Sequence, residues 1–319
     1  MTERRPSPEG VSAAAKRVTS HVTRTPLLPL ELEGGIRLWI KAECLQQGGS
    51  FKLRGAFNRL LQLSDRERAR GVVAFSSGNH AQGVALAARS LGIEAVIVMP
   101  SDAPAVKREA TEAAGATVVA YDRFTESREE IGARLAAERC ATLVPSFDDV
   151  DIIEGQGSVG VEIAEQLGFQ PDRVFVPCGG GGLSAGIALA LPNSKVTIVE
   201  PEGWDDMTRS LEAGEILPVG PNAPPTRCDA LQTLRVSPLT FDALRGAGAR
   251  GMAVSEEEIT QAIRFAHRHL RLVVEPGGAV ALAAALSGRA GTLGERSVVV
   301  VSGGNVDPRL YAEILAPGV

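Results

Sequence analysis

The stretch VFVPCGGGGLSAGIALAL, residues 174–191, decides the fold. An apolar run of strand length, Val174–Pro177, leads into four consecutive glycines and then into an alanine-rich segment, Ser184–Leu191, which is typical of a helix. Glycines let the backbone approach an anion closely, and the N–H groups at the start of a helix favour a phosphate. The stretch therefore predicts a strand, a turn and a helix. The turn either binds a phosphate or only packs the helix against its strand.

The same order of elements recurs along the chain. Continuous apolar strands that alternate with helices predict an α/β protein with mostly parallel sheets covered by helices. A length of 319 residues suits two α/β lobes rather than one minimal core. The first residues, up to about Pro8, are expected to be frayed. The predicted strands are Val72–Phe75, Ala95–Met99, Thr117–Ala120, Val174–Pro177, Val196–Glu200 and Ser297–Val301, and the predicted helices include 82–90, 104–114, 127–139 and 184–191.

The composition limits the class of protein. Hydrophobic residues at 44% and charged residues at 22% are typical of a globular enzyme, and a net charge of −5 disfavours nucleic acid as a partner. The longest apolar runs are far shorter than a membrane span, and residues 1–10 lack the apolar run of a signal peptide. The cysteines are too far apart to indicate a disulfide framework or a zinc knuckle. These features predict a cytoplasmic protein; its cysteines are Cys44, Cys140, Cys178 and Cys228.

Three turns follow predicted strands and are expected to share one cleft. They are Ser76–Asn79, Gly179–Gly182 and Ser302–Asn305, and ligands of open α/β sheets bind beyond the carboxyl ends of the strands. The first turn, with His80 after it, could hold a carboxylate or could simply cap a helix. The Ser302 hydroxyl could bond a ring nitrogen, although in isolation a plain glycine-rich turn is the more typical interpretation. None of these turns has the G-x-G-x-x-G or G-x-x-x-x-G-K-[ST] spacing of nucleotide-binding loops.

Two further segments carry reactive groups. Lys52 lies in SFKLRGA, residues 50–56, at the start of a helix-like stretch. A positive charge is disfavoured there, so the pKa of this amine could be lowered for Schiff-base chemistry. Taken alone, a surface lysine is the more typical interpretation. The acidic loop Glu200–Asp206 could bind a hard cation, although its spacing alone favours a solvated loop.

In this order, these stretches resemble the fold type II enzymes that use pyridoxal 5′-phosphate (PLP), specifically the threonine/serine dehydratase and serine racemase group. Together the matches run from about Thr25 to Asp307, which is nearly the whole chain. The resemblance implies the two-lobed architecture of tryptophan synthase β and a homodimer. The matching segments are Ser50–Ala56, Ser76–Gly83, Pro104–Lys107, Gly155–Gly157, Gly179–Gly186, Glu275–Ala279 and Ser302–Asp307.

The resemblance implies how PLP is held. Lys52 matches the lysine that carries the cofactor, and Phe51 matches the residue against its pyridine ring. Asn79 matches the partner of the 3′-oxygen, and Ser302 the partner of the ring nitrogen. The phosphate is expected in a cup formed by Gly179, Gly180, Gly181, Gly182 and the Leu183 amide.

The resemblance also implies a substrate site, a cation site and a mobile domain. Ser77 matches a residue that is the second acid/base in racemases, so it permits racemisation without establishing it. The predicted divalent cation is Mg²⁺, Mn²⁺ or Ca²⁺, bound by Glu200, Asp206 and the Trp204 carbonyl. A small mobile domain, residues 70–148, is expected within a large PLP-binding domain, residues 1–69 and 149–319. The residues expected to bind the substrate are Ser76, Ser77, Asn79, His80 and Arg128.

The function expected from this resemblance is dehydration of a small β-hydroxy amino acid. The leading hypothesis is an L-threonine/L-serine ammonia-lyase that forms a 2-oxo acid and ammonia by α,β-elimination, with the freed Lys52 amine taking the α-proton. The alternatives are a serine racemase, a 3-hydroxyaspartate dehydratase and, more distantly, a non-catalytic binding protein. Family members often have Ala-Asp-Gly in place of Cys228-Asp229-Ala230 and alanine in place of Glu154, and the first departure leaves the substrate preference open.

Overall fold

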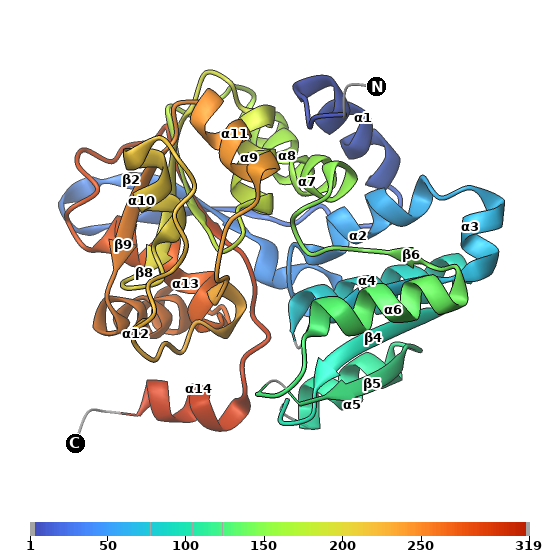
Figure 1. The fold of residues 1–319 in the computed structure, drawn as a ribbon. Coiled ribbons are helices and arrows are strands. Elements are labelled where there is room, and N and C mark those ends of the chain that lie inside the picture. Colours follow the sequence, from blue (N-terminus) through green and yellow to red (C-terminus); the bar gives the residue numbers. More distant parts are fainter. Residues whose placement is uncertain (1–3, 77, 104, 123, 317–319) are drawn as a thin grey trace.

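The computed structural model describes residues 4–316 other than 77, 104 and 123. Its strands form a six-stranded and a four-stranded sheet, which lie in separate parts of the molecule (Figure 1). The order in the larger sheet is β1-β2-β10-β7-β8-β9, and in the smaller sheet it is β5-β4-β3-β6. This arrangement confirms the predicted α/β architecture of mostly parallel sheets covered by helices.

The larger sheet is parallel except at one edge, where β1 pairs antiparallel with β2. Its central strand β10 is SVVVV, and every residue of it is buried, as a strand covered on both faces requires. Sequence patterns did not identify β1, β2 and β9, because their burial patterns mix exposed or half-buried with buried positions. The strands are β1 Leu27–Glu31, β2 Arg37–Ala42, β7 Arg173–Pro177, β8 Lys195–Pro201, β9 Arg250–Val254 and β10 Ser297–Val301.

The smaller sheet is parallel throughout. All its strands lie between Val72 and Leu143, within the segment expected to form the small domain. That this unit moves as a body stays a prediction. Its strands are β3 Val72–Phe75, β4 Ala95–Pro100, β5 Thr117–Tyr121 and β6 Thr142–Leu143, and its helices are α4 Asn79–Leu91, α5 Ala105–Ala113 and α6 Arg128–Arg139.

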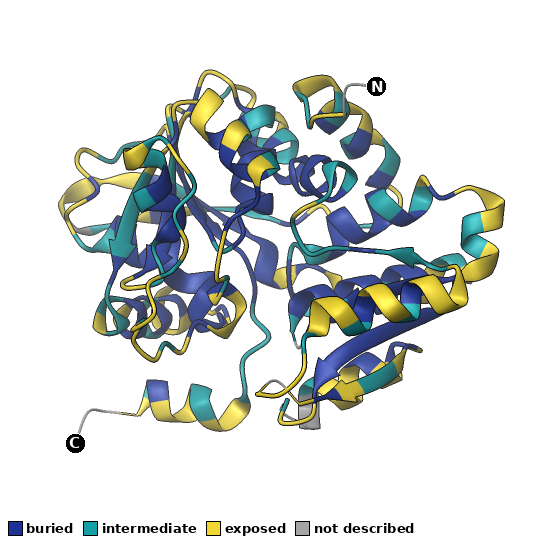
Figure 2. Cartoon of the chain, viewed as in Figure 1, coloured by how far each residue is buried: buried dark blue, intermediate teal, exposed yellow. Residues whose placement is uncertain are grey.

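The core of the larger unit is organised around one apolar helix. In α13, PGGAVALAAAL, all residues but the last are buried, and the helix packs against β7, β8 and β10 (Figure 2). Among the described residues, no helix is long and apolar enough to cross a membrane. The remaining α-helices are α1 Pro8–Val18, α2 Lys52–Leu61, α3 Asp65–Arg70, α7 Val150–Gln156, α8 Ser158–Leu167, α9 Gly182–Ala190, α10 Asp206–Ala213, α11 Pro238–Gly246, α12 Glu256–Phe265, α13 Pro276–Leu286 and α14 Pro308–Leu315.

The expectation that the residues before Pro8 are frayed is wrong for residues 4–7. Arg4 forms ion pairs with Asp151, at 2.5 Å, and with Glu154. The backbone N–H of Ser7 donates to Glu154 Oε1 at 3.2 Å, and the Ser7 side chain caps α1. Glu154 is the carboxylate that replaces the alanine common in the resembled family. This departure therefore provides the anchor for the N-terminal segment.

A buried cluster of charges ties α2 to the larger unit. The Arg54 side chain is fully buried, and its guanidinium donates to Glu43 Oε2 and to Glu162 Oε1, each at 2.7 Å. Lys41 Nζ lies 2.6 Å from the other oxygen of Glu162. Buried charges are tolerated only when each has a partner. Since α2 begins at Lys52, the cluster fixes the position of that lysine.

We expect Arg54→Leu to lower the free energy of unfolding by about 3–5 kcal/mol, because Glu43 would be left as an uncompensated buried charge. Urea denaturation followed by circular dichroism measures the change. The control is Arg24→Leu, since Arg24 and Glu165 form an exposed ion pair that should contribute at most about 1 kcal/mol. Equal losses in the two variants would contradict the assigned role of the buried cluster.

Candidate active site

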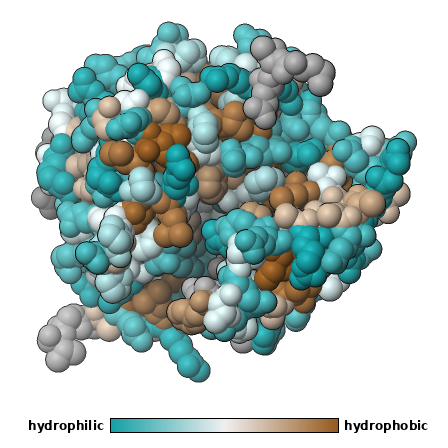
Figure 3. Space-filling model, viewed as in Figure 1, coloured by the Kyte–Doolittle hydropathy of each residue, from teal (hydrophilic) through white to brown (hydrophobic). Residues whose placement is uncertain are grey.

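The candidate site lies between the two sheets and consists of two adjoining cavities. The larger has a volume of about 710 Å³ and the smaller of about 50 Å³. Figure 3 shows a hollow in the molecular surface between the two units. Residues from all three predicted turns line the smaller cavity, so the structure brings the turns together. The residues that line both cavities are Lys52, Asn79, Phe147, Ala230 and Glu275.

The four glycines form a turn where close packing excludes a side chain. Gly181 has φ +86°, and a Cβ added at Gly180 would lie 2.3 Å from the ring of Phe147. Helix α9 begins at Gly182, two residues before the predicted start, so its first N–H groups belong to the turn itself. The glycines therefore do pack the helix closely against its surroundings, which is one of the two interpretations given above. The same geometry leaves the N–H groups at the start of α9 able to bind a phosphate.

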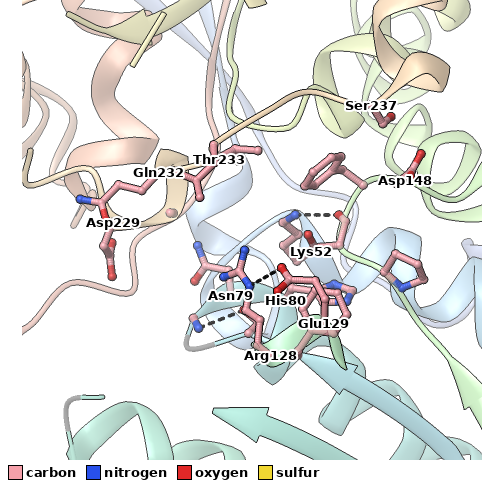
Figure 4. A pocket seen from close by; sticks show the side chains of 18 of the residues that line it. Lys52, Asn79, His80, Arg128, Glu129, Asp148, Asp229, Gln232, Thr233 and Ser237 are labelled. Carbon is pink, nitrogen blue, oxygen red and sulfur yellow. Dashed lines mark hydrogen bonds and ion pairs between the residues drawn. The ribbon is translucent and has the colours of Figure 1, made fainter. Parts of the chain in front are cut away.

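Lys52 is the first residue of α2, and its amine points into the site (Figure 4). The amine donates a hydrogen bond to the carbonyl oxygen of Ser146 at 2.9 Å and lies 5.2 Å from the centre of the Phe51 ring. Burial lowers the pKa of Lys52 to about 8, while the nearby Glu275 carboxylate acts in the opposite direction. The expected lowering of this pKa therefore has burial as its main cause.

Glu275 lines the site, although the sequence analysis gave it no role and named it only as the start of the matching segment Glu275–Ala279. Its carboxylate oxygen Oε1 accepts a hydrogen bond from Asn79 Nδ2 at 2.5 Å, and the side chain borders both cavities. Burial raises the pKa of Glu275 to about 7, with a further increase from Asp229. The sequence did contain a signal for Glu275: a carboxylate directly before the uniformly apolar stretch Pro276–Leu286 has few polar neighbours in sequence. Such a group is expected to be buried and to need a partner from elsewhere in the chain.

Ser302 lies at the end of β10 and lines the same small cavity as the glycines and Phe51. Its carbonyl oxygen accepts a hydrogen bond from the N–H of Phe51 at 3.2 Å, and Gly303 pairs with Ser50 in a short β-bridge. The end of this strand therefore holds the loop that precedes Lys52. The predicted roles of Ser302 and Phe51 beside a cofactor ring are compatible with these positions.

The turn after β3 provides backbone donors rather than a charged histidine. Helix α4 begins at Asn79 without a side-chain cap, and Ser76 Oγ accepts from the N–H of Gly78 at 3.1 Å. His80 Nε2 lies 2.9 Å from the carbonyl oxygen of Val144, and burial followed by the charge of Lys52 lowers the pKa of His80 to about 3. A neutral His80 cannot attract a carboxylate by charge. The predicted acid/base, Ser77, lies outside the described residues.

Basic side chains line the larger cavity. Arg128, the first residue of α6, donates from Nε to Glu129 Oε1 at 2.8 Å, and its guanidinium lies 5.7 Å from the centre of the Phe75 ring. Figure 4 shows Arg128 beside His80, on the wall formed by the smaller unit. Lys107, to which the sequence analysis gave no role, lies in α5 of the same smaller unit and contacts Asp229 of the larger unit across the cavity. The cavity thus has cationic groups in addition to Lys52.

The predicted cation ligands lie around the turn from β8 to α10: Glu200 is in β8, Trp204 is in the connecting loop and Asp206 is the first residue of α10. The Glu200 carboxylate accepts from the N–H of Thr208 at 2.8 Å and from that of Met207 at 3.1 Å. Oδ2 of Asp206 is buried and has no hydrogen-bond partner among the described residues. Burial raises the pKa of Glu200 to about 8 and that of Asp206 to about 6. Within the described part of the chain, no three His, Cys, Asp or Glu side chains gather as a metal site.

Comparison with known proteins places this geometry in a family. The model of the pyridoxal-phosphate-dependent enzymes matches residues 18–304. L-threo-3-hydroxyaspartate ammonia-lyases from Pseudomonas sp and Saccharomyces cerevisiae are 44% and 41% identical to the chain, covering 96% and 95% of it and 97% and 94% of their own lengths. The structure of maize serine racemase superposes with a TM-score of 0.91 at 35% identity, covering 97% of each chain.

The site fits the cofactor of this family. Lys52 provides an amine of lowered pKa, the glycine turn provides a cradle that a single Cβ would fill, and Ser302 completes the same cavity. The resemblance inferred from the sequence is therefore confirmed, and PLP is the cofactor. The chain belongs to the pyridoxal-phosphate-dependent enzymes of fold type II.

Proposed function

We propose that the protein is an ammonia-lyase that acts on 3-hydroxyaspartate, releasing a 2-oxo acid and ammonia. The similarity to two L-threo-3-hydroxyaspartate ammonia-lyases over nearly the whole chain carries this proposal. It replaces the leading sequence hypothesis of an L-threonine/L-serine ammonia-lyase with one of its alternatives. The motifs from which that hypothesis came concern the cofactor, which the dehydratases of this group share, and so they do not distinguish between substrates.

Two features of the larger cavity, a helix N-terminus and the Arg128 side chain, support a substrate with two carboxylates. The uncapped N-terminus of α4 can receive the α-carboxylate, because its first N–H groups have no partners within the helix and its first residues line the larger cavity. Arg128, beside that helix on the same wall, is the group we assign to the second carboxylate. A planar guanidinium binds a carboxylate through two parallel hydrogen bonds. Serine and threonine have no group that would use this contact.

The residues around Lys52 suit removal of the α-proton. When bound, PLP supplies an electron-withdrawing ring that makes the α-carbon of the amino acid acidic. Lys52, with a pKa of about 8, has a neutral amine in an appreciable fraction of molecules near neutral pH and can accept the proton there. The Ser146 carbonyl oxygen orients this amine. Ser302 gives the ring nitrogen a neutral partner, so no carboxylate stabilises a charge at that position.

A divalent cation at Glu200 and Asp206 is a second part of the proposal. Two buried carboxyls whose pKa values are raised by burial, one with an unpartnered oxygen among the described residues, would both gain from a bound Mg²⁺, Mn²⁺ or Ca²⁺. The Trp204 carbonyl would be a third oxygen ligand. Such a cation would lie behind the glycine turn and support it through Met207, whose methyl group lies against Gly181. Assembly as a homodimer stays a prediction.

The substrate assignment is tested by measuring 2-oxo acid release from the PLP-loaded protein with L-threo- and erythro-3-hydroxyaspartate, L-threonine, L-serine and D-serine. We expect the highest kcat/KM for one isomer of 3-hydroxyaspartate. Higher values for L-threonine or L-serine would contradict the proposal. The chirality of the remaining amino acid is measured in parallel, and its inversion with little 2-oxo acid would make the protein a racemase instead.

Arg128→Gln should lower kcat/KM for 3-hydroxyaspartate about 10- to 100-fold, because a charge-assisted contact with the second carboxylate is lost. The value for L-serine should change less than about threefold by the same reasoning. The control is Arg134→Gln, on the exposed face of the same helix, where Arg134 pairs with Glu138. An equal loss for both substrates would show that Arg128 binds a group that they share.

The pKa of Lys52 predicts a pH dependence for cofactor loading. Only the neutral amine forms a Schiff base, and an amine with a pKa of about 8 is protonated below that pH. The rate of PLP incorporation should therefore rise about tenfold per pH unit up to about pH 8 and then level off. The long-wavelength absorbance of the bound cofactor measures it. Lys52→Ala should lose both this absorbance and the activity, and a variant with wild-type turnover would falsify the role of Lys52.

Removal of divalent cations with EDTA should lower the Tm of the protein, and adding back a saturating cation should raise it by about 2–5 °C, because the cation binds only the folded state. Differential scanning fluorimetry with Mg²⁺, Mn²⁺ or Ca²⁺ measures the shift. In Asp206→Asn the shift should disappear. An unchanged Tm in the wild type after thorough chelation and re-addition would rule out the cation site.

A further inference from the structure

The side-chain amide of Asn79 is held from both sides. Its Nδ2 donates to Glu275 Oε1 at 2.5 Å, and its Oδ1 accepts from Asn305 Nδ2 at 2.8 Å. Asn305 Nδ2 also lies 2.7 Å from the carbonyl oxygen of Gly48, which keeps the donor in place. An acceptor on one side and a donor on the other allow only one orientation of the amide. One N–H of Asn79 Nδ2 is then left for another acceptor.

The Glu275 carboxylate is committed to this contact. Glu275 is the residue before α13, but its side chain does not cap the helix. It is 97% buried, its N–H donates to the carbonyl oxygen of Gly303, and its carboxylate lies so close to Gly303 that an added Cβ would be 2.0 Å from Oε1. A buried carboxylate without partners is costly, so its hydrogen bond to Asn79 is favoured more strongly than one in water.

We propose that Glu275 is a positioning residue for the cofactor: by accepting one proton of the Asn79 amide, it turns the other toward the 3′-oxygen of PLP. Rotation of the amide by half a turn would place Oδ1 of Asn79 against that oxygen, and two acceptors would then repel each other. Glu275 and Asn305 together oppose this rotation. The proposal depends on the family and its cofactor, which the comparisons show, and is independent of the substrate assigned above.

Two substitutions separate the contact from the charge. Glu275→Gln keeps an acceptor oxygen at the same reach but removes the charge, whereas Glu275→Asp keeps the charge but withdraws it by one methylene. We measure the dissociation constant of PLP and the position of its absorbance band without substrate. We expect Glu275→Asp to weaken PLP binding about three- to tenfold, the effect of one hydrogen bond, and to shift the band. Glu275→Gln should bind PLP within about twofold of the wild type, because the contact is kept.

The Asn79→Ala background shows whether Glu275 acts through Asn79. There, Glu275→Asp should have no further effect on PLP binding or on the band. A persistent effect in this background would overturn the proposal, as would wild-type binding by Glu275→Asp or a larger loss in Glu275→Gln than in Glu275→Asp.

Glu154→Gln is the matched control, since Glu154 is also a buried carboxylate whose pKa is raised by burial but lies at the N-terminal segment. Its PLP binding and absorbance band should be those of the wild type. If Glu275→Asp does not fold, Asn305→Leu replaces it, because this variant removes the donor on the other side of the Asn79 amide. It should weaken PLP binding in the wild-type background and not in Asn79→Ala, and any other pattern contradicts the proposal.

Discussion

The close approach of backbone and side chains after β7 is the constraint on which the rest of the site depends. Gly180 faces the ring of Phe147, and Gly181 has a positive φ and faces Met207 and Thr240, so no larger residue fits at either position. This packing places the start of α9 at the edge of the cleft, where its N–H groups face the position of an anion. The same glycines connect three regions, because Phe147 follows the smaller sheet, Met207 donates its N–H to the predicted cation ligand Glu200, and Thr240 lies in the first turn of α11.

Electrostatics in the site follow from burial more than from pairing. Lys52 and Glu275 have pKa values moved toward each other, to about 8 and about 7, and in both cases loss of hydration is the first cause. Each of the two charges partly offsets the effect of burial on the pKa of the other. The cavity therefore holds a base and an acid that both titrate near neutral pH. In contrast, Arg54 and Glu43 on the far side of α2 are fully paired. The pair of Arg54 and Glu43 provides rigidity.

Local patterns predicted the fold and the cofactor site because each motif is contiguous in sequence. Strands β3, β7 and β10 and the turns after them were identified from their apolar runs and small residues, and the turns meet as expected. Strand β6 has two residues and β1 joins as an antiparallel edge, so neither has a recognisable period. Glu275 and Lys107 belong to matching segments but received no role, for a different reason: their partners, Asn79 and Asp229, are more than a hundred residues away in sequence. Substrate preference depends on such distant contacts, and the motifs therefore left it open.

The segment between β6 and α7 has a mechanical consequence. It leads from the smaller sheet back to the larger unit, and within it the Ser146 carbonyl accepts from the Lys52 amine while Phe147 lies against the glycine turn. A displacement of the smaller sheet would pull on this segment. The force would reach the Lys52 amine through the Ser146 carbonyl and the glycine turn through the ring of Phe147. Closure of the cleft and binding of the cofactor would then be coupled. A substrate that draws the two walls together would also strengthen the binding of PLP.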